Sequence, residues 1–211
     1  MELSLWYEGQ IRSNPGAYGF AQDRKLEDVS HLFWTRALWA YTLPESKQNF
    51  AITITAGTSL DADRLSGYRL GGFLPMTSEF PLDLPGYNFQ ELSAERFVLI
   101  GGQYTLPLDS AKCWSLTAFS GTAWVDYLKG LEQPGRWNSG VGGGVGYQPR
   151  AKSWQIMAGY AYGIDAIRSH GTGSHVIGVL CQIDLSATGS DGSRAHMNPN
   201  KFRGLNWILG R

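Results

Sequence analysis

Charge is scarce in this sequence, and neither sign is in excess. Only 17% of the 211 residues are charged, with 18 basic and 18 acidic side chains. A dedicated nucleic-acid-binding protein carries a basic surface, so the neutral balance argues against nucleic acid as a partner. Long apolar runs are lacking too. No stretch of about 18 consecutive apolar residues is present, which excludes a transmembrane helix.

Cysteines are few, and catalytic motifs are missing. The two cysteines, Cys113 and Cys181, lie far apart and form no C-x-x-C motif. We therefore expect no metal site, no redox centre and no cofactor. The Gly-x-Ser-x-Gly elbow, the nucleophile signature of α/β-hydrolases, does not occur in the sequence either. The chain is thus not expected to be an enzyme.

Glycine and aromatic residues, by contrast, are abundant, with 27 Gly, 8 Trp and 13% aromatic residues in all. Large apolar residues recur most often at every second position of the sequence. From 154 to 165 large apolar side chains alternate with small or polar ones, the large set being Trp154, Ile156, Ala158, Tyr160, Tyr162 and Ile164. Successive side chains of a strand point to opposite faces, so this pattern predicts a two-faced strand.

The same test predicts an all-β, antiparallel fold with about eight strands. Their expected ranges are 2–12, 31–43, 47–59, 91–107, 111–124, 138–149, 153–164 and 173–186. Tight turns at 43–46, 107–110 and 148–151 alternate with longer connections at 13–30, 60–90, 125–137 and 165–172. Short turns at one end and long loops at the other are typical of outer-membrane β-barrels.

Tryptophan spacing adds a length argument for a transmembrane barrel. Trp114 and Trp124 share a strand face and lie ten residues apart, a span of roughly 33 Å at about 3.3 Å per residue. At a tilt of about 40° the height is roughly 25 Å, which equals the apolar band of an outer-membrane barrel with an aromatic girdle at each rim. We assign Trp114, Trp124 and Trp154 to these girdles.

The longest connection, 60–90, carries motifs that resemble a known family. Leu70-Gly71-Gly72 is followed by Leu84-Pro85-Gly86-Tyr87, and the next strand ends in Pro107-Leu108. This order resembles the C-terminal half of the bacterial surface antigen family, the sixteen-stranded outer-membrane barrels of BamA-type insertases, two-partner translocators and patatin-linked barrels. In that family a loop carrying an Arg-Gly-Tyr or Arg-Gly-Phe motif folds back into the barrel lumen.

One departure from the family pattern concerns an ion pair. Where the family has the loop Arg, this chain has Pro85. The family's partner Asp lies in a Phe-x-Asp-x-Gly motif, and the corresponding stretch here begins at Phe119 and has Gly121 in place of the Asp. Because both partners are missing, no buried charge is left without a partner, which would cost about 3–5 kcal/mol. We expect the loop to dock instead through Gly86, Tyr87 and Phe89, and this uncharged motif is more similar to the patatin-linked branch.

The resemblance implies a function and a location. Residues 1–185 would be the C-terminal portion of a sixteen-stranded barrel in the bacterial outer membrane, with the loop 60–90 in the lumen, and 186–211 a flexible tail. The barrel would serve protein insertion or translocation, or anchor a patatin-like lipase. Its expected partners are outer-membrane lipid, an N-terminal barrel half, and an upstream periplasmic or patatin domain. Because an isolated half-barrel leaves two unpaired edges, this chain would then be a fragment, a sequence with a misassigned start, or a remnant. The lack of a secretory signal at its start fits an export signal that lies upstream.

Two alternatives remain open at the level of sequence. A self-contained eight-stranded outer-membrane barrel would have a structural or binding role. A soluble β-sandwich, acting as a hydrolase or a carbohydrate-binding module, would also use exposed aromatic residues. Asp165, Arg168 and His170 fall in the predicted loop 165–172, where we interpret them as a solvated charge cluster.

Overall fold

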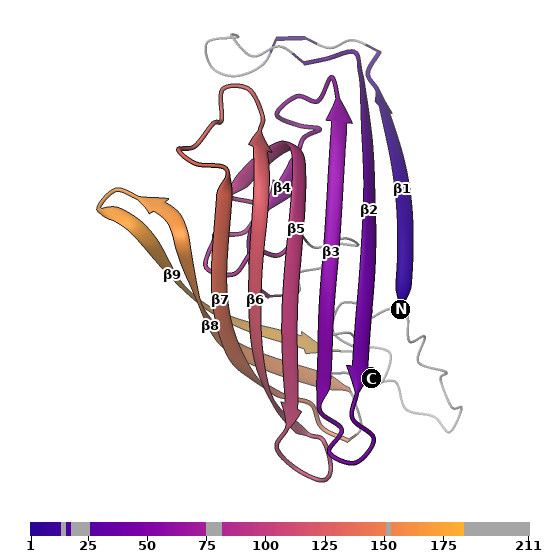
Figure 1. Ribbon diagram of the computed structural model, residues 1–211, viewed down its shortest axis with the longest axis vertical. Helices are drawn as coiled ribbons and strands as arrows, with labels where there is room; N and C mark the ends of the chain where they lie inside the picture. The colour runs from indigo at the N-terminus through magenta and orange to yellow at the C-terminus, as the bar shows by residue number, and fades with distance from the viewer. Residues whose placement is uncertain (14–15, 18–25, 75–81, 151–152, 184–211) are drawn as a thin grey trace.

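The computed structural model describes residues 1–13, 16–17, 26–74, 82–150 and 153–183 (Figure 1). These residues form one antiparallel sheet of nine strands. They contain no helix long and apolar enough to cross a membrane. The strands are β1 (Glu2–Ile11), β2 (Val29–Thr42), β3 (Asn49–Leu60), β4 (Tyr68–Leu70), β5 (Leu92–Pro107), β6 (Trp114–Tyr127), β7 (Trp137–Tyr147), β8 (Trp154–Arg168) and β9 (Gly171–Ile183). The all-β, antiparallel prediction is confirmed.

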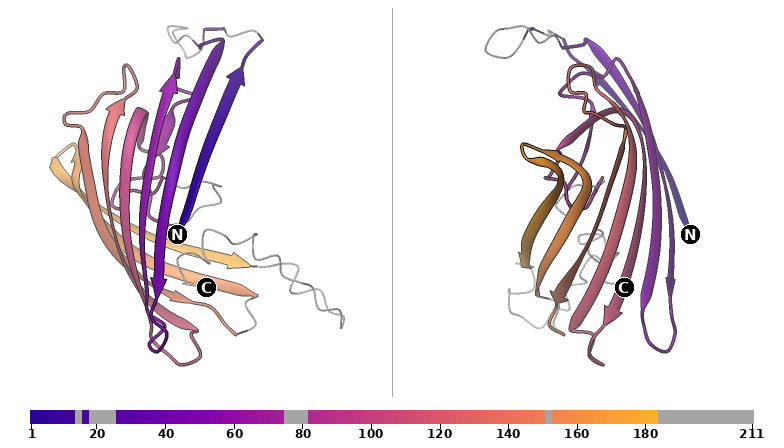
Figure 2. Two further views of the ribbon diagram at one scale, coloured as in Figure 1. Left: turned by 45° about the vertical axis from the view of Figure 1, so that its right-hand side comes forward. Right: turned by 60° about the vertical axis from the view of Figure 1, so that its left-hand side comes forward.

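The sheet runs in the order β1-β2-β3-β5-β6-β7-β8-β9, and the three-residue β4 pairs with the start of β5. The sheet curves around β4 and the segment that follows it, but it does not close into a barrel (Figure 2). In the described part of the chain, β1 pairs only with β2, and β9 only with β8. The described residues form a single sheet, which contradicts the sandwich alternative, because a sandwich needs a second sheet packed face to face.

Each long strand has two faces of different chemistry, as its alternating pattern predicts. The outer face carries large apolar side chains that are exposed on every long strand, among them Leu3, Leu5, Phe33, Trp39, Ile52, Ile54, Val98, Ile100, Leu116, Val141, Ile156, Ile164, Ile177 and Val179. The inner face carries small and polar residues together with a buried cluster that includes Leu70, Leu84, Tyr87, Leu92, Phe97 and Val125. The core therefore lies on the inner side of the curved sheet.

Two details of the predicted strands need correction. The short strand β4 lies inside the predicted loop 60–90, and a three-residue strand is too brief for a period of two to be visible. The predicted long connection 165–172 is wrong. β8 and β9 run on to a two-residue turn at 169–170, with an irregularity in their register between Gly163 and Ile167. The predicted tail 186–211 lies outside the described residues.

At the end of the sheet that carries the long connections, Asp63 ties the β1–β2 connection to its own connection after β3. Arg12 donates to its carboxylate across 2.5 Å, and the backbone amides of Glu27 and Leu65 donate across 3.1 and 2.8 Å. Burial raises the pKa of Asp63, but the hydrogen bonds from the amides of Glu27 and Leu65 and two from Ser66 outweigh burial, so the pKa lies below its ordinary value. The buried carboxylate is thus held in its charged form and fixes this rim.

Candidate functional site: a loop docked on the inner face

The connection between β4 and β5 leaves the sheet and returns along its inner face. We call its described residues, 71–74 and 82–91, the inner loop. It begins at Gly71 and Gly72, whose φ angles of +130° and +100° are readily adopted only by glycine. The amide of Gly71 donates to the carbonyl of Leu82 across 3.0 Å, and that of Gly72 to the carbonyl of Tyr87 across 3.2 Å. These glycines therefore turn the chain and pair the two arms of the loop.

The tip of the inner loop is a Pro-Gly turn. The amide of Tyr87 lies 3.4 Å from the carbonyl oxygen of Leu84, and Gly86 between them has φ +79°. Proline in the second position and a glycine of positive φ in the third are the residues that a type II turn requires. Pro85 thus favours the turn that presents the tip to the sheet.

The tip rests on three glycines that lie side by side on β6, β7 and β8. Gly121 pairs with Gly140, and Gly140 with Gly163. We call these three residues the glycine row. A Cβ atom on Gly140 would lie 1.9 Å from the carbonyl oxygen of Pro85, and a Cβ on Gly86 would lie 1.8 Å from the amide nitrogen of Gly163. The backbone of the loop and the backbone of the sheet are therefore in direct contact.

A second contact joins the start of the inner loop to β8 and β9. The ring of Phe73 stacks on Phe119 with centroids 5.6 Å apart. It also approaches Gly159, where an added Cβ would lie 2.9 Å from the ring. Leu74 contacts Gly178 of β9 in the same way, at 2.5 Å from an added Cβ. The inner loop thus spans the inner face from β4 to β9.

Tyr87 is fully buried between the inner loop and the sheet. Its hydroxyl donates to Oδ1 of Asn138 across 3.3 Å, and Nδ2 of Asn138 donates to the hydroxyl of Tyr127 across 2.9 Å. This chain of hydrogen bonds provides polar partners for a phenol that is removed from water. By contrast, Phe89, which the sequence also assigned to docking, is 52% exposed. That expectation was wrong, because Phe89 lies on the turn that leads back to β5.

An ion pair that the sequence did not reveal closes the loop. Both terminal nitrogens of Arg168 donate to the carboxylate of Glu91, across 2.5 and 2.9 Å. The Nε of Arg168 donates to Ser174, and Glu91 also accepts from the amide of Asn88. The sequence pattern places Arg168 in a solvated charge cluster with Asp165 and His170. That interpretation is wrong for Arg168, because its guanidinium pairs with Glu91. Glu91 and Arg168 are 77 residues apart, so no local pattern could have joined them.

Asp83 brings an acid to the inner face. Removal of water around its carboxyl raises its pKa to about 7, although the positive charge of Arg36 on β2 acts in the opposite direction. A raised acid pKa favours the protonated form in the docked state. Docking is thus most stable below the ordinary aspartate pKa and becomes weaker as the pH rises through about 7.

We expect undocking of the inner loop to increase between about pH 5 and pH 8. The readout is thiol labelling of Ala123→Cys, a fully buried position in the same cluster as Leu84 and Tyr87, in a chain with Cys113→Ser and Cys181→Ser. Labelling normalised to the denatured protein should accelerate roughly tenfold or more. Asp83→Asn should make the profile flat, and a profile that is the same in both proteins would contradict the role of this carboxyl.

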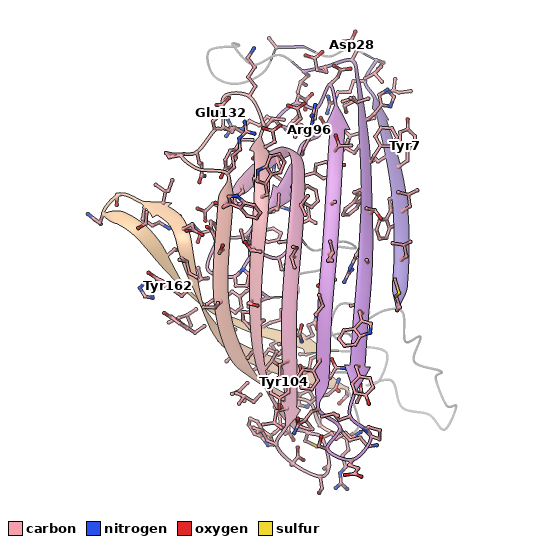
Figure 3. The ribbon with its side chains drawn as sticks, in the orientation of Figure 1. Tyr7, Asp28, Arg96, Tyr104, Glu132 and Tyr162 are labelled. Atoms are coloured by element: carbon pink, nitrogen blue, oxygen red, sulfur yellow. The ribbon has the colours of Figure 1, made fainter. Side chains whose placement is uncertain are left out.

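The tryptophans assigned to girdles lie at the two ends of the outer face. Trp114 contacts Tyr147 with ring centroids 4.7 Å apart, and Tyr147 contacts Trp154 at 5.3 Å, at the end of the sheet where Tyr104 also lies (Figure 3). Trp124 lies at the opposite end, paired with Trp137 and with the guanidinium of Arg136 5.7 Å from its ring centre.

The structure brings together most of the residues that the sequence singled out. Leu84 and Pro85 meet Gly121 on the inner face, Gly86 lies against Gly163, and Phe119 contacts the same loop through Phe73. Tyr87 is buried in the same cluster as Leu84 and donates to Asn138. Sequence reasoning missed Gly140 and Gly163, whose part in docking depends on strand register, and the Glu91–Arg168 pair. Among the described residues, no group of three or more His, Cys, Asp or Glu side chains is arranged to hold a metal.

Comparisons with known proteins identify no relative: no family model, no curated protein and no solved structure matches this chain.

Proposed function

We propose that this chain is half of an outer-membrane β-barrel of the surface antigen type, with its outer face in lipid and its inner loop in the lumen. The role that follows is protein insertion or translocation, or membrane anchoring of a patatin-like lipase. The chain itself supplies a membrane span and a lumen loop and performs no chemistry. The other eight strands, and any periplasmic or patatin domain, come from polypeptide outside this chain.

The chemistry of the outer face is the observation that carries this proposal. Exposed apolar side chains follow every long strand, and no element of the described part of the chain covers them. Soluble monomers rarely expose contiguous apolar patches larger than a few hundred Å². Lipid covers such a face favourably, because burial of apolar surface is the main driving force for insertion. The strands have 10 to 16 residues apart from β4, which meets the roughly 9–11 residues that a tilted membrane strand needs.

The inner loop is the second support. In a barrel the inner face would line the lumen, and a loop that is bound to the sheet backbone from β4 to β9 would reduce or direct passage through it. Its docking by a Pro-Gly turn, a glycine row and an ion pair restricts it to one arrangement. We infer that the loop fixes the curvature of this half of the barrel.

Heat-modifiable migration tests the proposal. The protein should fractionate with the outer membrane, and its band in an unheated gel should migrate differently from that in a boiled sample, since folded membrane barrels resist the detergent. Extraction should require detergent rather than high salt or alkali. A protein that is monodisperse in buffer without detergent, with one electrophoretic mobility before and after boiling, would contradict the proposal.

A further inference from the structure

The two edges of the sheet present unsatisfied backbone groups. In the described residues nothing pairs with the outer side of β1 or of β9. In water such edges attract other strands, and in the hydrocarbon of a membrane each unpaired backbone group costs several kcal/mol. A stable membrane structure therefore needs a strand against each edge.

The direction of the strands restricts what can pair there. Eight long strands alternate in direction along the sheet, so β1 and β9 run in opposite directions. A rotation about an axis along the strands would bring β9 of one copy beside β1 of another in antiparallel pairing. Both copies would keep the same orientation in the membrane. With an odd number of alternating strands, the two edge strands would run in the same direction, and this antiparallel pairing would be impossible.

The two edges also match in length and in the chemistry of their faces. β1 has 10 residues and β9 has 13. Leu5 on β1 is 80% exposed and Ile177 on β9 is 79% exposed, both on the outer face, so pairing the two edges would make the apolar surface continuous. β1 carries Glu2 and Glu8, whereas β9 has no acidic residue. A β1–β9 seam thus avoids the like charges that a β1–β1 seam would bring together.

Closure of one copy on itself is opposed by the inner loop. The interior of an eight-stranded barrel is about filled by its own side chains. Here Leu84 and Tyr87 are fully buried on the inner face, and the loop reaches as far as Gly178 on β9. A ring of these eight strands alone would have to expel the loop from its buried contacts, so additional strands are needed.

We propose that a second copy of this chain supplies them, with β1 of each copy paired to β9 of the other. The two copies form a sixteen-stranded ring around a two-fold axis, with two identical seams and one inner loop from each copy in the lumen. Such a closed cyclic pair is the commonest symmetry of homo-oligomers. This inference rests on the proposed function, because the seams are needed only if the sheet lies in a membrane.

Disulfide trapping at the seam tests the inference. Cys181 lies on β9 and is exposed, so it serves as one partner, and Cys113→Ser removes the other native thiol. Single cysteines are introduced along the outer face of β1, at Leu3, Leu5, Tyr7, Gly9 and Ile11. The matched controls are inner-face positions of the same strand, Ser4, Trp6 and Gln10, which cannot face Cys181 across an antiparallel pair. The proteins are made from the native gene and oxidised in the outer membrane.

The expected result is a covalent dimer at twice the 23.3 kDa of one chain for one or two neighbouring outer-face positions, and for no inner-face control. A disulfide within a single chain would overturn the inference in favour of an eight-stranded barrel. A monomer without cross-links, or a longer native polypeptide with strands preceding Glu2, would overturn it in favour of an N-terminal barrel half. Whether the seam forms between two copies, within one chain or with an N-terminal barrel half, heat-modifiable migration should persist. Loss of heat-modifiable migration would instead contradict the proposed function itself.

Discussion

Gly86→Ala is expected to release the inner loop from the sheet. The new methyl group would lie 1.8 Å from the amide nitrogen of Gly163 and 2.2 Å from the carbonyl carbon of Tyr162, both of them backbone atoms that the pairing of β8 holds in place. The loop must therefore move away. We expect labelling of Ala123→Cys to become roughly a hundredfold faster, the ratio that corresponds to about 2.7 kcal/mol of lost docking free energy.

Gly130 offers a matched control for this substitution. It has the same φ of +79°, and a Cβ added there would meet nothing within 4 Å. Gly130→Ala thus introduces the same backbone strain, about 1–2 kcal/mol, without the collision. It should leave labelling of Ala123→Cys unchanged. Equal effects of the two substitutions would mean that strain, not contact with Gly163, explains the glycine at the tip.

Among the substitutions, removal of the charge on Arg168 is expected to have the second-largest effect on docking. Arg168→Gln leaves the carboxylate of Glu91, which is 16% exposed, without its bidentate partner. Breaking a buried pair from one side costs about 3–5 kcal/mol, and the partial exposure of Arg168 reduces this to an expected 1–2 kcal/mol. Labelling of Ala123→Cys should accelerate by roughly tenfold.

A double-mutant cycle with Glu91→Gln shows whether the two residues act as a pair. If they do, the double variant should label no faster than either single variant, because the second substitution removes a charge that has already lost its partner. Arg136→Gln is the control, since Arg136 is 62% exposed and lies 3.5 Å from Asp126 in an ion pair at the surface. Additive effects of Arg168→Gln and Glu91→Gln would contradict the pairing as a determinant of docking.

Release of the inner loop in these variants should also change the function of the proposed barrel. The glycine row and the ion pair both hold the loop across β6, β7 and β8, the strands that lie between β5 and β9. Release of the loop would uncover the inner face and relax the curvature of the sheet. In the proposed barrel it would also open the lumen, so the Gly86 and Arg168 variants should differ from the native protein in passage of small solutes as well.

The strands themselves could be predicted from local pattern. An alternation such as that from Trp154 to Ile164 separates a large apolar face from a small one, and the register of β8 with β7 preserves it. The end of β8 could not be predicted in this way. Asp165 and Arg168 interrupt the apolar pattern beyond an irregularity in the ladder, and such residues indicate a loop unless their partners are known.

The docking site shows the same division between local and tertiary information. Pro85 and Gly86 specify a turn by their own conformational preferences, and Gly71 and Gly72 specify a reversal of the chain, so the sequence by itself determined the shape of the loop. Where the loop lies was decided only by the tertiary structure. Gly121, Gly140 and Gly163 form one row only because three strands pair in a particular register, and Glu91 meets Arg168 only because the sheet curves around the loop.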